Sequence, residues 1–325
     1  MSRILFIDQQ GLKALPNRNQ VDELFHKYDL SYVSSTKAGR LIVENQGVDV
    51  VISNHPDFTF FSYLREKHPS THIILVTELP MKDYSEALNG EEEILIDHVI
   101  SLKSQGFWTI QELRVTVSKV LNPSDIFGIE KYLLPGTKIE KRPITGSKDR
   151  ETLNDSVIKF ATSCRLGQHL SKMAFGITEE LLMNTIHDAP LAAGIMHYSE
   201  QPRTAPVSLK PEEFGELSYG CDGRVLAISA SDPFGALKKQ KLFQYLKKVL
   251  RRKDSVGLID TKKEGAGLGF FKILYSSHAI VCNVKPNSQT EIMSLINVNE
   301  QLRDFSSMPR SIHFFSSTDA VSKVG

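Results

Sequence analysis

Three polar residues at four-residue intervals form the clearest candidate ligand-binding surface in the sequence. They are Glu180, Asn184 and Asp188 in the segment FGITEELLMNTIHDAP. We expect a helix that begins near Thr178, a good N-cap residue, and stops at Pro190. Residues four apart share one face of a helix, and the apolar residues between them form another. The segment therefore predicts a polar, ligand-facing wall backed by core.

Two later segments have chemistry suited to a nucleotide. The strand RVLAISAS delivers Asp232 at its end, and the loop GAGLG at 265–269 opens the apolar segment FFKILYSS. Glycines at a helix start let backbone amides approach phosphates, and the helix dipole favours the anion. The GxGxG pattern alone is weak evidence. Because it does not follow a strand in the first βαβ unit, it disfavours a Rossmann dinucleotide site.

Taken in order, these segments resemble the GHKL family, the ATP-binding domains of the gyrase and histidine-kinase type. EELLMN resembles the N box, SDPFGAL the first glycine box, GAGLGF the second, and QTEIMSLINV the final strand. The resemblance covers about residues 150–300. It implies an α/β-sandwich domain that binds ATP and Mg²⁺.

The resemblance also implies roles for single residues. Asn184 would hold Mg²⁺, Asp232 would accept a hydrogen bond from the adenine amino group, and Thr290 would join the adenine network. Glu180 stands where family members that hydrolyse ATP or phosphorylate serine place the residue that activates the attacking oxygen. The other candidate cofactor-binding residues are Asp188 on the N-box helix, Gly235 in the first glycine box, and Gly265, Gly267 and Gly269, which would frame a mobile lid over the phosphates.

The first glycine box departs from the family pattern DxGxG. Phe234 and Ala236 occupy the positions two and four residues after Asp232. We expect Gly235 to supply the turn, and the bulk of Phe234 either to narrow the pocket or to change the adenine loop.

The first 121 residues have the pattern of a doubly wound parallel sheet, with short apolar runs alternating with amphipathic stretches. Continuous runs such as VDVVIS and HIILVT imply strands covered on both faces. The expected strands are Arg3 to Asp8, Ser31 to Ser34, Asp49 to Asn54, His72 to Thr77 and His98 to Leu102.

This part resembles the receiver domain of bacterial response regulators. Asp8, Thr77 and Lys103 match three of its functional positions, but Asn54 stands where the phosphate-accepting Asp is expected. The first strand ends in Asp8-Gln9 instead of paired acids. Because an amide cannot form an acyl phosphate, we expect a degenerate receiver-like domain.

The length of 325 residues suggests about two domains. We expect a receiver-like domain over 1–121, a linker over 122–150, a GHKL-type ATP-binding domain over 151–300 and a C-terminal extension over 301–325. The linker assignment rests on three prolines, three glycines and many charges between Asn122 and Arg150.

The composition excludes several classes of protein. A net charge of +1 gives no global field that would attract nucleic acid or an anionic membrane, which disfavours nucleic acid as a partner. No segment has the length of apolar residues needed to span a bilayer. The three cysteines are far apart and odd in number, which predicts neither a disulfide framework nor a CxxC metal site and fits a reducing cytoplasm.

We interpret the chain as a cytoplasmic bacterial signalling protein that binds ATP and Mg²⁺ and acts on a protein partner. One hypothesis is an ATPase or a protein Ser/Thr kinase of the anti-sigma-factor type; the other is a non-catalytic scaffold. A hybrid histidine kinase is disfavoured, because His169 lacks the usual acidic neighbour of a phosphoacceptor. The basic stretch from Lys238 to Lys253 predicts an amphipathic helix with a solvated outer face, or one that steers ATP or an acidic partner. The sequence leaves a homo-oligomer open.

Overall fold

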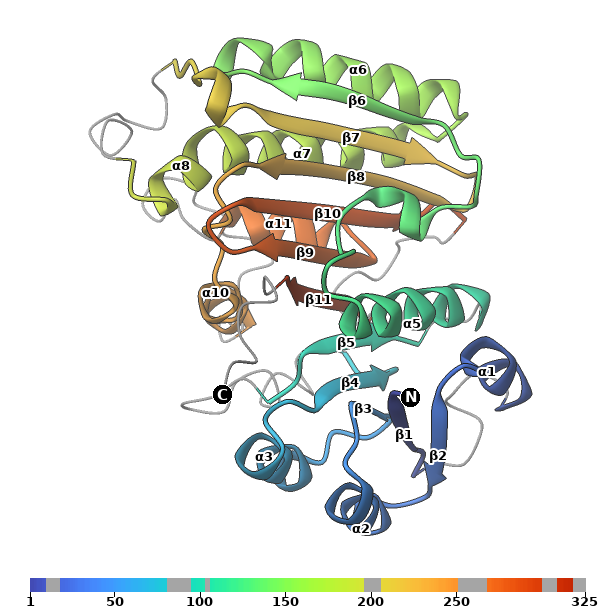
Figure 1. Ribbon diagram of the computed structural model, residues 1–325. Helices are drawn as coiled ribbons and strands as arrows, with labels where there is room; N and C mark the ends of the chain where they lie inside the picture. Colours follow the sequence, from blue (N-terminus) through green and yellow to red (C-terminus); the bar gives the residue numbers. More distant parts are fainter. Residues whose placement is uncertain are drawn as a thin grey trace. The chain divides into compact units, whose positions relative to one another are not determined.

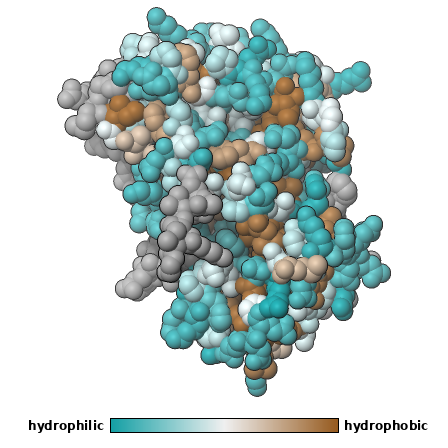
Figure 2. Space-filling model, in the orientation of Figure 1, coloured by the Kyte–Doolittle hydropathy of each residue, from teal (hydrophilic) through white to brown (hydrophobic). Residues whose placement is uncertain are grey.

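The chain forms two compact α/β units, which we describe from a computed structural model (Figure 1). The structure describes residues 1–9, 18–80, 95–102, 106–195, 206–250, 268–299 and 309–317. The first unit comprises residues 1–122 and 304–313, and the second comprises 123–303 and 314–325. Hydrophilic residues cover most of the coloured surface in Figure 2, while the strands of both units are largely buried.

The first unit is built on a parallel sheet with the strand order β2-β1-β3-β4-β5. Its strands are β1 (Arg3–Ile7), β2 (Asp29–Val33), β3 (Val50–Ser53), β4 (His72–Thr77) and β5 (His98–Ser101). Its helices are α1 (Arg18–Phe25), α2 (Thr36–Gln46), α3 (Phe58–Lys67) and α5 (Gly106–Leu121). This order and direction are those of the flavodoxin-like doubly wound fold, to which receiver domains belong. The predicted receiver-like fold is therefore confirmed for this unit.

Alternating side chains of β1 show that helices cover both faces of this sheet. The ring of Phe6 lies 6.3 Å from that of Phe25 on α1 and 5.0 Å from that of Tyr32. On α2, a Cβ added to Gly39 would come within 2.8 Å of the Ile7 side chain. Because neighbouring residues of a strand point to opposite faces, α1 and α2 lie on opposite sides of the sheet.

Residues near the carboxyl end of the chain complete the first unit. The strand β11 (Ser311–Ser316) starts by pairing antiparallel with β5, where Ile312 lies opposite Val99. The buried His313 contacts the buried Glu112 of α5 through a hydrogen bond of 2.9 Å. The segment expected to be a C-terminal extension thus contributes a strand to the fold.

The second unit is built on an antiparallel sheet with the strand order β9-β10-β8-β7-β6. Its strands are β6 (Ile139–Ile144), β7 (Gly215–Cys221), β8 (Val225–Asp232), β9 (Ala279–Lys285) and β10 (Gln289–Asn297). Its helices are α6 (Arg150–Ser163), α7 (Gln168–Met183), α8 (Ala189–Ala192), α10 (Lys239–Leu250) and α11 (Leu268–Tyr275). Helices α6, α7 and α11 lie along one face of this sheet (Figure 1).

The segment expected to be a linker is an integral part of the second unit. It contains strand β6 and two 3₁₀ turns, η1 (Ile129–Tyr132) and η2 (Ser147–Asp149). Strand β6 is an edge strand and three of its six residues are exposed, including Pro143. Edge strands tolerate proline and carry charge, which gave this strand the composition of a linker.

A buried carboxylate holds this segment on the sheet. Glu291 of β10 accepts hydrogen bonds from the backbone N–H of Gly128 at 3.0 Å, from Asn283 Nδ2 at 2.8 Å and from Ser229 Oγ at 3.0 Å. Each of these donors belongs to a different element of the unit. The charge of Glu291 is therefore balanced by hydrogen bonds that join η1 to three strands.

Within the described part of the chain, no helix has both the length and the apolar character needed to cross a membrane.

Candidate functional site

The helix that carries the polar residues is longer than the sequence predicts. Helix α7 begins at Gln168, so the prediction of a start near Thr178 is wrong. Thr178 is buried inside the helix, where its hydroxyl donates to the Ala174 carbonyl at 2.8 Å. Nor does the helical path stop at Pro190. A π-helical turn, η3 (Asn184–Asp188), leads into α8, and Pro190 occupies its first turn, where proline is tolerated.

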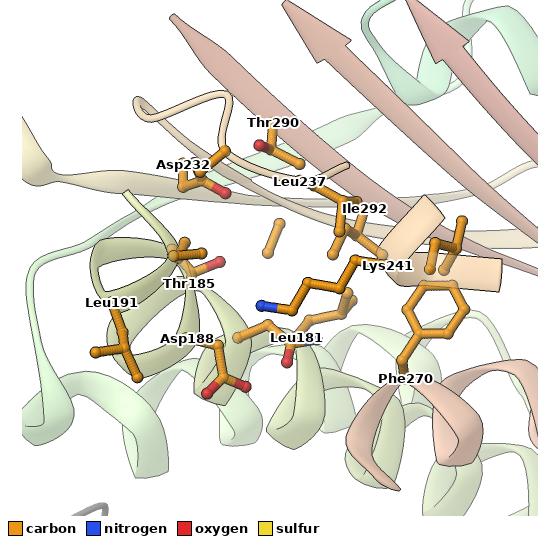
Figure 3. Close-up of a pocket in the computed structure, with 16 residues that line it drawn as sticks. Leu181, Thr185, Asp188, Leu191, Asp232, Leu237, Lys241, Phe270, Thr290 and Ile292 are labelled. Carbon is orange, nitrogen blue, oxygen red and sulfur yellow. The ribbon is translucent and has the colours of Figure 1, made fainter. Parts of the chain in front are cut away.

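A cavity of about 200 Å³ lies in the second unit between this helical segment and the sheet (Figure 3). Asn184 and Asp188 contribute to one wall, and Asp232 and Thr290 contribute to the sheet side. Thr185 and Lys241 also line it, and the other lining residues are apolar or small: Leu181, Ala189, Leu191, Ala192, Ala230, Ala236, Leu237, Leu242, Phe270 and Ile292. Four of the predicted site residues therefore meet around one cavity. A mostly apolar cavity with a few convergent polar groups is the usual form of a small-molecule site.

Asp232 is a buried acid in the lining of the cavity. Its side chain is at the end of β8 and lies opposite Thr290 in the register of β8 and β10. Burial raises its pKa to about 6, while hydrogen bonds from the Phe234 and Gly235 backbone and from Thr290 act in the opposite direction. The Phe234 N–H donates to Oδ1 at 2.9 Å. A buried carboxylate with one face toward a cavity is suited to accept a hydrogen bond from a bound ligand.

Gly235 shapes the loop that follows Asp232. Its φ is +62°, a conformation that favours glycine. A Cβ at this position would overlap the Lys285 carbonyl oxygen and lie 2.7 Å from the backbone nitrogens of Asn287 and Ser288. The contacts of Gly235 are thus with the turn between β9 and β10, and not with the cavity.

The departure from the DxGxG pattern has a simple structural form. Phe234 does not line the cavity, whereas Ala236 does. Compared with glycine, an alanine at this position adds only one methyl group to the lining. The space in the cavity is therefore almost the same as it would be with a glycine.

Glu180 lies beside the cavity and not in its lining. Its Oε1 pairs with Nζ of Lys272 on α11 at 2.6 Å. At the start of α11, a Cβ on Gly269 would overlap Glu180 Oε2 and lie 3.8 Å from Asn184 Oδ1. The absence of a side chain at Gly269 therefore lets the amino-terminal end of α11 approach both polar residues of α7 and η3. Gly265 and Gly267 lie outside the described residues.

The donor set of the cavity is compatible with Mg²⁺. No group of three or more His, Cys, Asp or Glu side chains among the described residues is placed to hold a metal ion. Magnesium bound with a nucleotide usually takes only one or two protein oxygens, with phosphate oxygens and water as its other ligands. Asn184 Oδ1 and the Asp188 carboxylate are oxygen donors of this kind on one wall of the cavity.

Lys241 is a cavity residue that sequence reasoning did not single out. Its side chain extends from α10 across the cavity toward Thr185 and Asp188 (Figure 3). In the sequence it was one of many cations in the stretch from Lys238 to Lys253. No spacing in the sequence set it apart from these neighbouring cations.

In the first unit, Asn54 occupies the strand end where a receiver carries its phosphate acceptor. Its Nδ2 donates to Asp8 Oδ1, and its Oδ1 accepts from the Gln9 N–H at 3.1 Å. Thr77 is buried at the end of β4. Asp57 serves as the N-cap of α3, with Oδ1 accepting from the Phe60 N–H at 3.0 Å. Lys103 lies outside the described residues.

Comparisons with known proteins give similarities to parts of solved structures. A signal receiver domain of an HD domain-containing protein from Pseudomonas fluorescens Pf-5 is 25% identical, with 38% of this chain and 95% of that chain covered and a TM-score of 0.31. A response regulator receiver domain from Clostridium thermocellum is 18% identical, with coverages of 39% and 98% and a TM-score of 0.30. The SiaB–SiaC complex from Pseudomonas aeruginosa gives 14% identity, coverages of 49% and 88%, and a TM-score of 0.30. No family model and no curated protein matches the chain. At these TM-scores we take neither fold nor function from the similarities; the receiver-like fold rests on strand order and direction.

Proposed function

We propose that the second unit binds ATP together with Mg²⁺ in the cavity between η3 and the sheet, in the manner of a GHKL-type domain. The observation that carries this proposal is that Asn184, Asp232 and Thr290 line the same cavity although they come from distant segments. Their order along the chain is also the order of the family's motifs. The helical layer over an antiparallel sheet supports the same proposal.

The adenine end of the ligand would lie near Asp232 and Thr290. The carboxylate of Asp232 would accept a hydrogen bond from the adenine amino group, and the apolar lining would contact the ring. Asn184 and Asp188 would offer oxygens to Mg²⁺. Lys241, which extends toward the same wall (Figure 3), would place a cation near the phosphates. The glycine loop at 265–269 would close over the phosphates with backbone N–H groups.

The favoured reaction is in-line phosphoryl transfer to water or to a serine or threonine of a protein partner. Bound Mg²⁺ supplies charge neutralisation at the phosphates. Glu180 would orient the attacking hydroxyl and accept its proton at a carboxylate oxygen. In the described structure Lys272 holds Oε1 of that carboxylate. Proton acceptance therefore requires Oε2, or release from Lys272.

We assign the first unit a regulatory or docking role in a cytoplasmic signalling protein. The side chain of Asn54 donates a hydrogen bond to Asp8 at the strand ends where a receiver would hold metal and phosphate. The amide has no carboxylate oxygen to accept a phosphoryl group. The unit would then act through its surface on a protein partner, with no aspartyl phosphate formed.

The second candidate function is a non-catalytic scaffold built from the same two units. The pairing of Glu180 with Lys272 favours it, because Lys272 occupies one of the two carboxylate oxygens that could act on an attacking hydroxyl. The two functions differ in their products. The enzyme releases phosphate or phosphorylates its partner, and the scaffold does neither.

Thermal melting tests the proposal in its simplest form. A ligand at about 100 times its Kd stabilises the folded state by about 2.7 kcal/mol, which raises the Tm of a unit of this size by about 5 to 10 °C. We expect ATP with Mg²⁺ to raise the Tm of the wild type and to raise that of Asn184→Ala by much less. Equal shifts in the two proteins would place the Mg²⁺ site elsewhere. Phosphate release measured in parallel separates the enzyme from the scaffold.

A further inference from the structure

Two of the three cysteines are neighbours in the fold although they are distant in the sequence. Cys164 follows directly after α6, and Cys221 is the last residue of β7. Both are free thiols of intermediate exposure, whereas Cys282 is fully buried in β9. Neither the spacing nor the number of cysteines in the sequence indicates this pairing.

The packing of α6 on β7 brings the two thiols together. Ser156 and Phe160 lie four residues apart on α6, and both contact Tyr219 of β7. The Tyr219 hydroxyl donates to Ser156 Oγ at 3.1 Å, and the Phe160 and Tyr219 rings are 5.1 Å apart. Cys164 is the next residue on that helical face, and Cys221 is the next residue on that strand face.

The backbone confirms that Cys164 continues this face. Its N–H donates to the Phe160 carbonyl at 3.0 Å, as in a regular helix. The contact between α6 and β7 therefore extends by one further pair. In this pair the Cys164 thiol is near enough to that of Cys221 to act on its pKa.

We propose that Cys164 and Cys221 are a redox modification site that forms a reversible intramolecular disulfide when the protein meets a peroxide. The Cys164 thiolate attacks one oxygen of hydrogen peroxide, the O–O bond breaks, and the hydroxide released takes up a proton to become water. Cys164 is then a sulfenic acid. The Cys221 sulfur attacks it, the S–S bond forms, and the S–O bond breaks. The departing hydroxide takes the Cys221 proton and leaves as a second water.

The burial of Cys221 favours one order of the two steps. It raises the pKa of this thiol and so disfavours its thiolate. We therefore assign the attack on the peroxide to Cys164 and the resolving role to Cys221.

The bond would close a loop that contains all of α7 and η3. This loop carries Asn184 and Asp188, so the cross-link ties the helical wall of the cavity to the sheet. Closing a long loop restricts the unfolded chain, and we therefore expect the oxidised protein to melt at a higher temperature. The inference does not depend on nucleotide binding.

Thiol counting and mass spectrometry on the full chain test this site. We would treat the native protein with hydrogen peroxide, block the remaining thiols with an alkylating reagent, and map the disulfides after digestion. We expect the three free thiols to fall to one, with the mass of the chain lowered by two hydrogen atoms and Cys282 the alkylated residue. Dithiothreitol should restore all three thiols and the original Tm.

Single substitutions provide the matched controls. Cys164→Ser and Cys221→Ser should each abolish the disulfide and the rise in Tm, and Cys282→Ala should retain both. Cys221→Ser should also leave Cys164 as a sulfenic acid that a dimedone probe traps. The proposal is overturned if wild type keeps three free thiols. The proposal is also overturned if the wild-type protein forms only disulfides between chains, or if Cys282 takes part in the disulfide.

Discussion

Asp232→Asn should stabilise the protein at neutral pH even though it removes a residue that we place at the ligand. In the folded protein Asp232 is 8% exposed, and its carboxyl is surrounded by the cavity lining and the first residues after β8. Asparagine has the shape of the neutral carboxyl and retains an oxygen for the Phe234 N–H. The substitution therefore removes the buried charge with little change in packing.

The magnitude follows from the proton affinity of the buried carboxyl. Burial raises its pKa from the usual 3.8 to about 6. At about 1.36 kcal/mol for each pKa unit, ionised Asp232 lowers the free energy of unfolding by about 3 kcal/mol relative to the neutral form.

The sign of the pH dependence is also fixed. Because the folded state holds the proton more tightly than the unfolded state, the wild type is favoured at low pH and loses stability as the pH rises from about 4 to about 6. The variant has no such loss. Its advantage should be about 3 kcal/mol at pH 7, about half of that at pH 5, and close to zero below pH 4.

Urea unfolding of both proteins between pH 5 and pH 7.5 measures this difference. Asp222→Asn is the matched control, because Asp222 accepts hydrogen bonds from the backbone N–H groups of Leu134, Arg224 and Val225. The same chemical change should destabilise the protein there, by about 1 to 3 kcal/mol. The reasoning fails if Asp232→Asn is less stable than wild type at pH 7, or if its advantage does not vary with pH.

Three further predictions concern turn geometry, phosphorylation and turnover. Gly235→Ala should lower the free energy of unfolding by about 2 to 4 kcal/mol, because it adds a clash with backbone atoms to a left-handed conformation; urea unfolding measures this. Small-molecule phosphodonors with Mg²⁺ should leave the mass of the first unit unchanged, since Asn54 replaces the acceptor; a hydroxylamine-sensitive adduct in this unit would refute that. Glu180→Gln should retain most ATP binding and reduce phosphate release by about 10²- to 10⁴-fold, and unchanged release would remove Glu180 from the reaction.

The strands of the first unit could be predicted from the sequence, because each one is a short apolar run that is recognisable without knowledge of the rest of the fold. Runs such as HIILVT are apolar on both faces, and the structure places β4 over the predicted range His72–Thr77. The sequence also showed that Asn54 stands where a receiver has its phosphate-accepting Asp, and this single residue type decides whether an acyl phosphate can form. The hydrogen bond between Asn54 and Asp8 could not be predicted from the sequence, because it joins the ends of two strands that are distant in the chain.

In the second unit, several features could not be predicted from local sequence patterns. The polar residues of α7 and η3 could be recognised in the sequence. The predicted helix start was wrong, because Thr178 lies inside the helix, where its hydroxyl donates to a backbone carbonyl. Strand β6 was taken for a linker because edge strands share the charge and proline content of loops. The cavity position of Lys241 was hidden among neighbouring cations. The pairing of Cys164 with Cys221 depends on the register of a helix on a strand, which no local pattern specifies.

Calorimetric titration of the full chain with ATP, with and without Mg²⁺, tests the central claim most directly. We predict one ATP bound per chain, with higher affinity when Mg²⁺ is present. In Asp232→Ala the lost hydrogen bond to a charged acceptor should cost on the order of 1.5 to 3 kcal/mol, which is about a 10- to 100-fold rise in Kd. A folded wild type that gives no binding heat and no rise in Tm with ATP would contradict the proposal, and equal affinities in wild type and Asp232→Ala would contradict the placement of adenine.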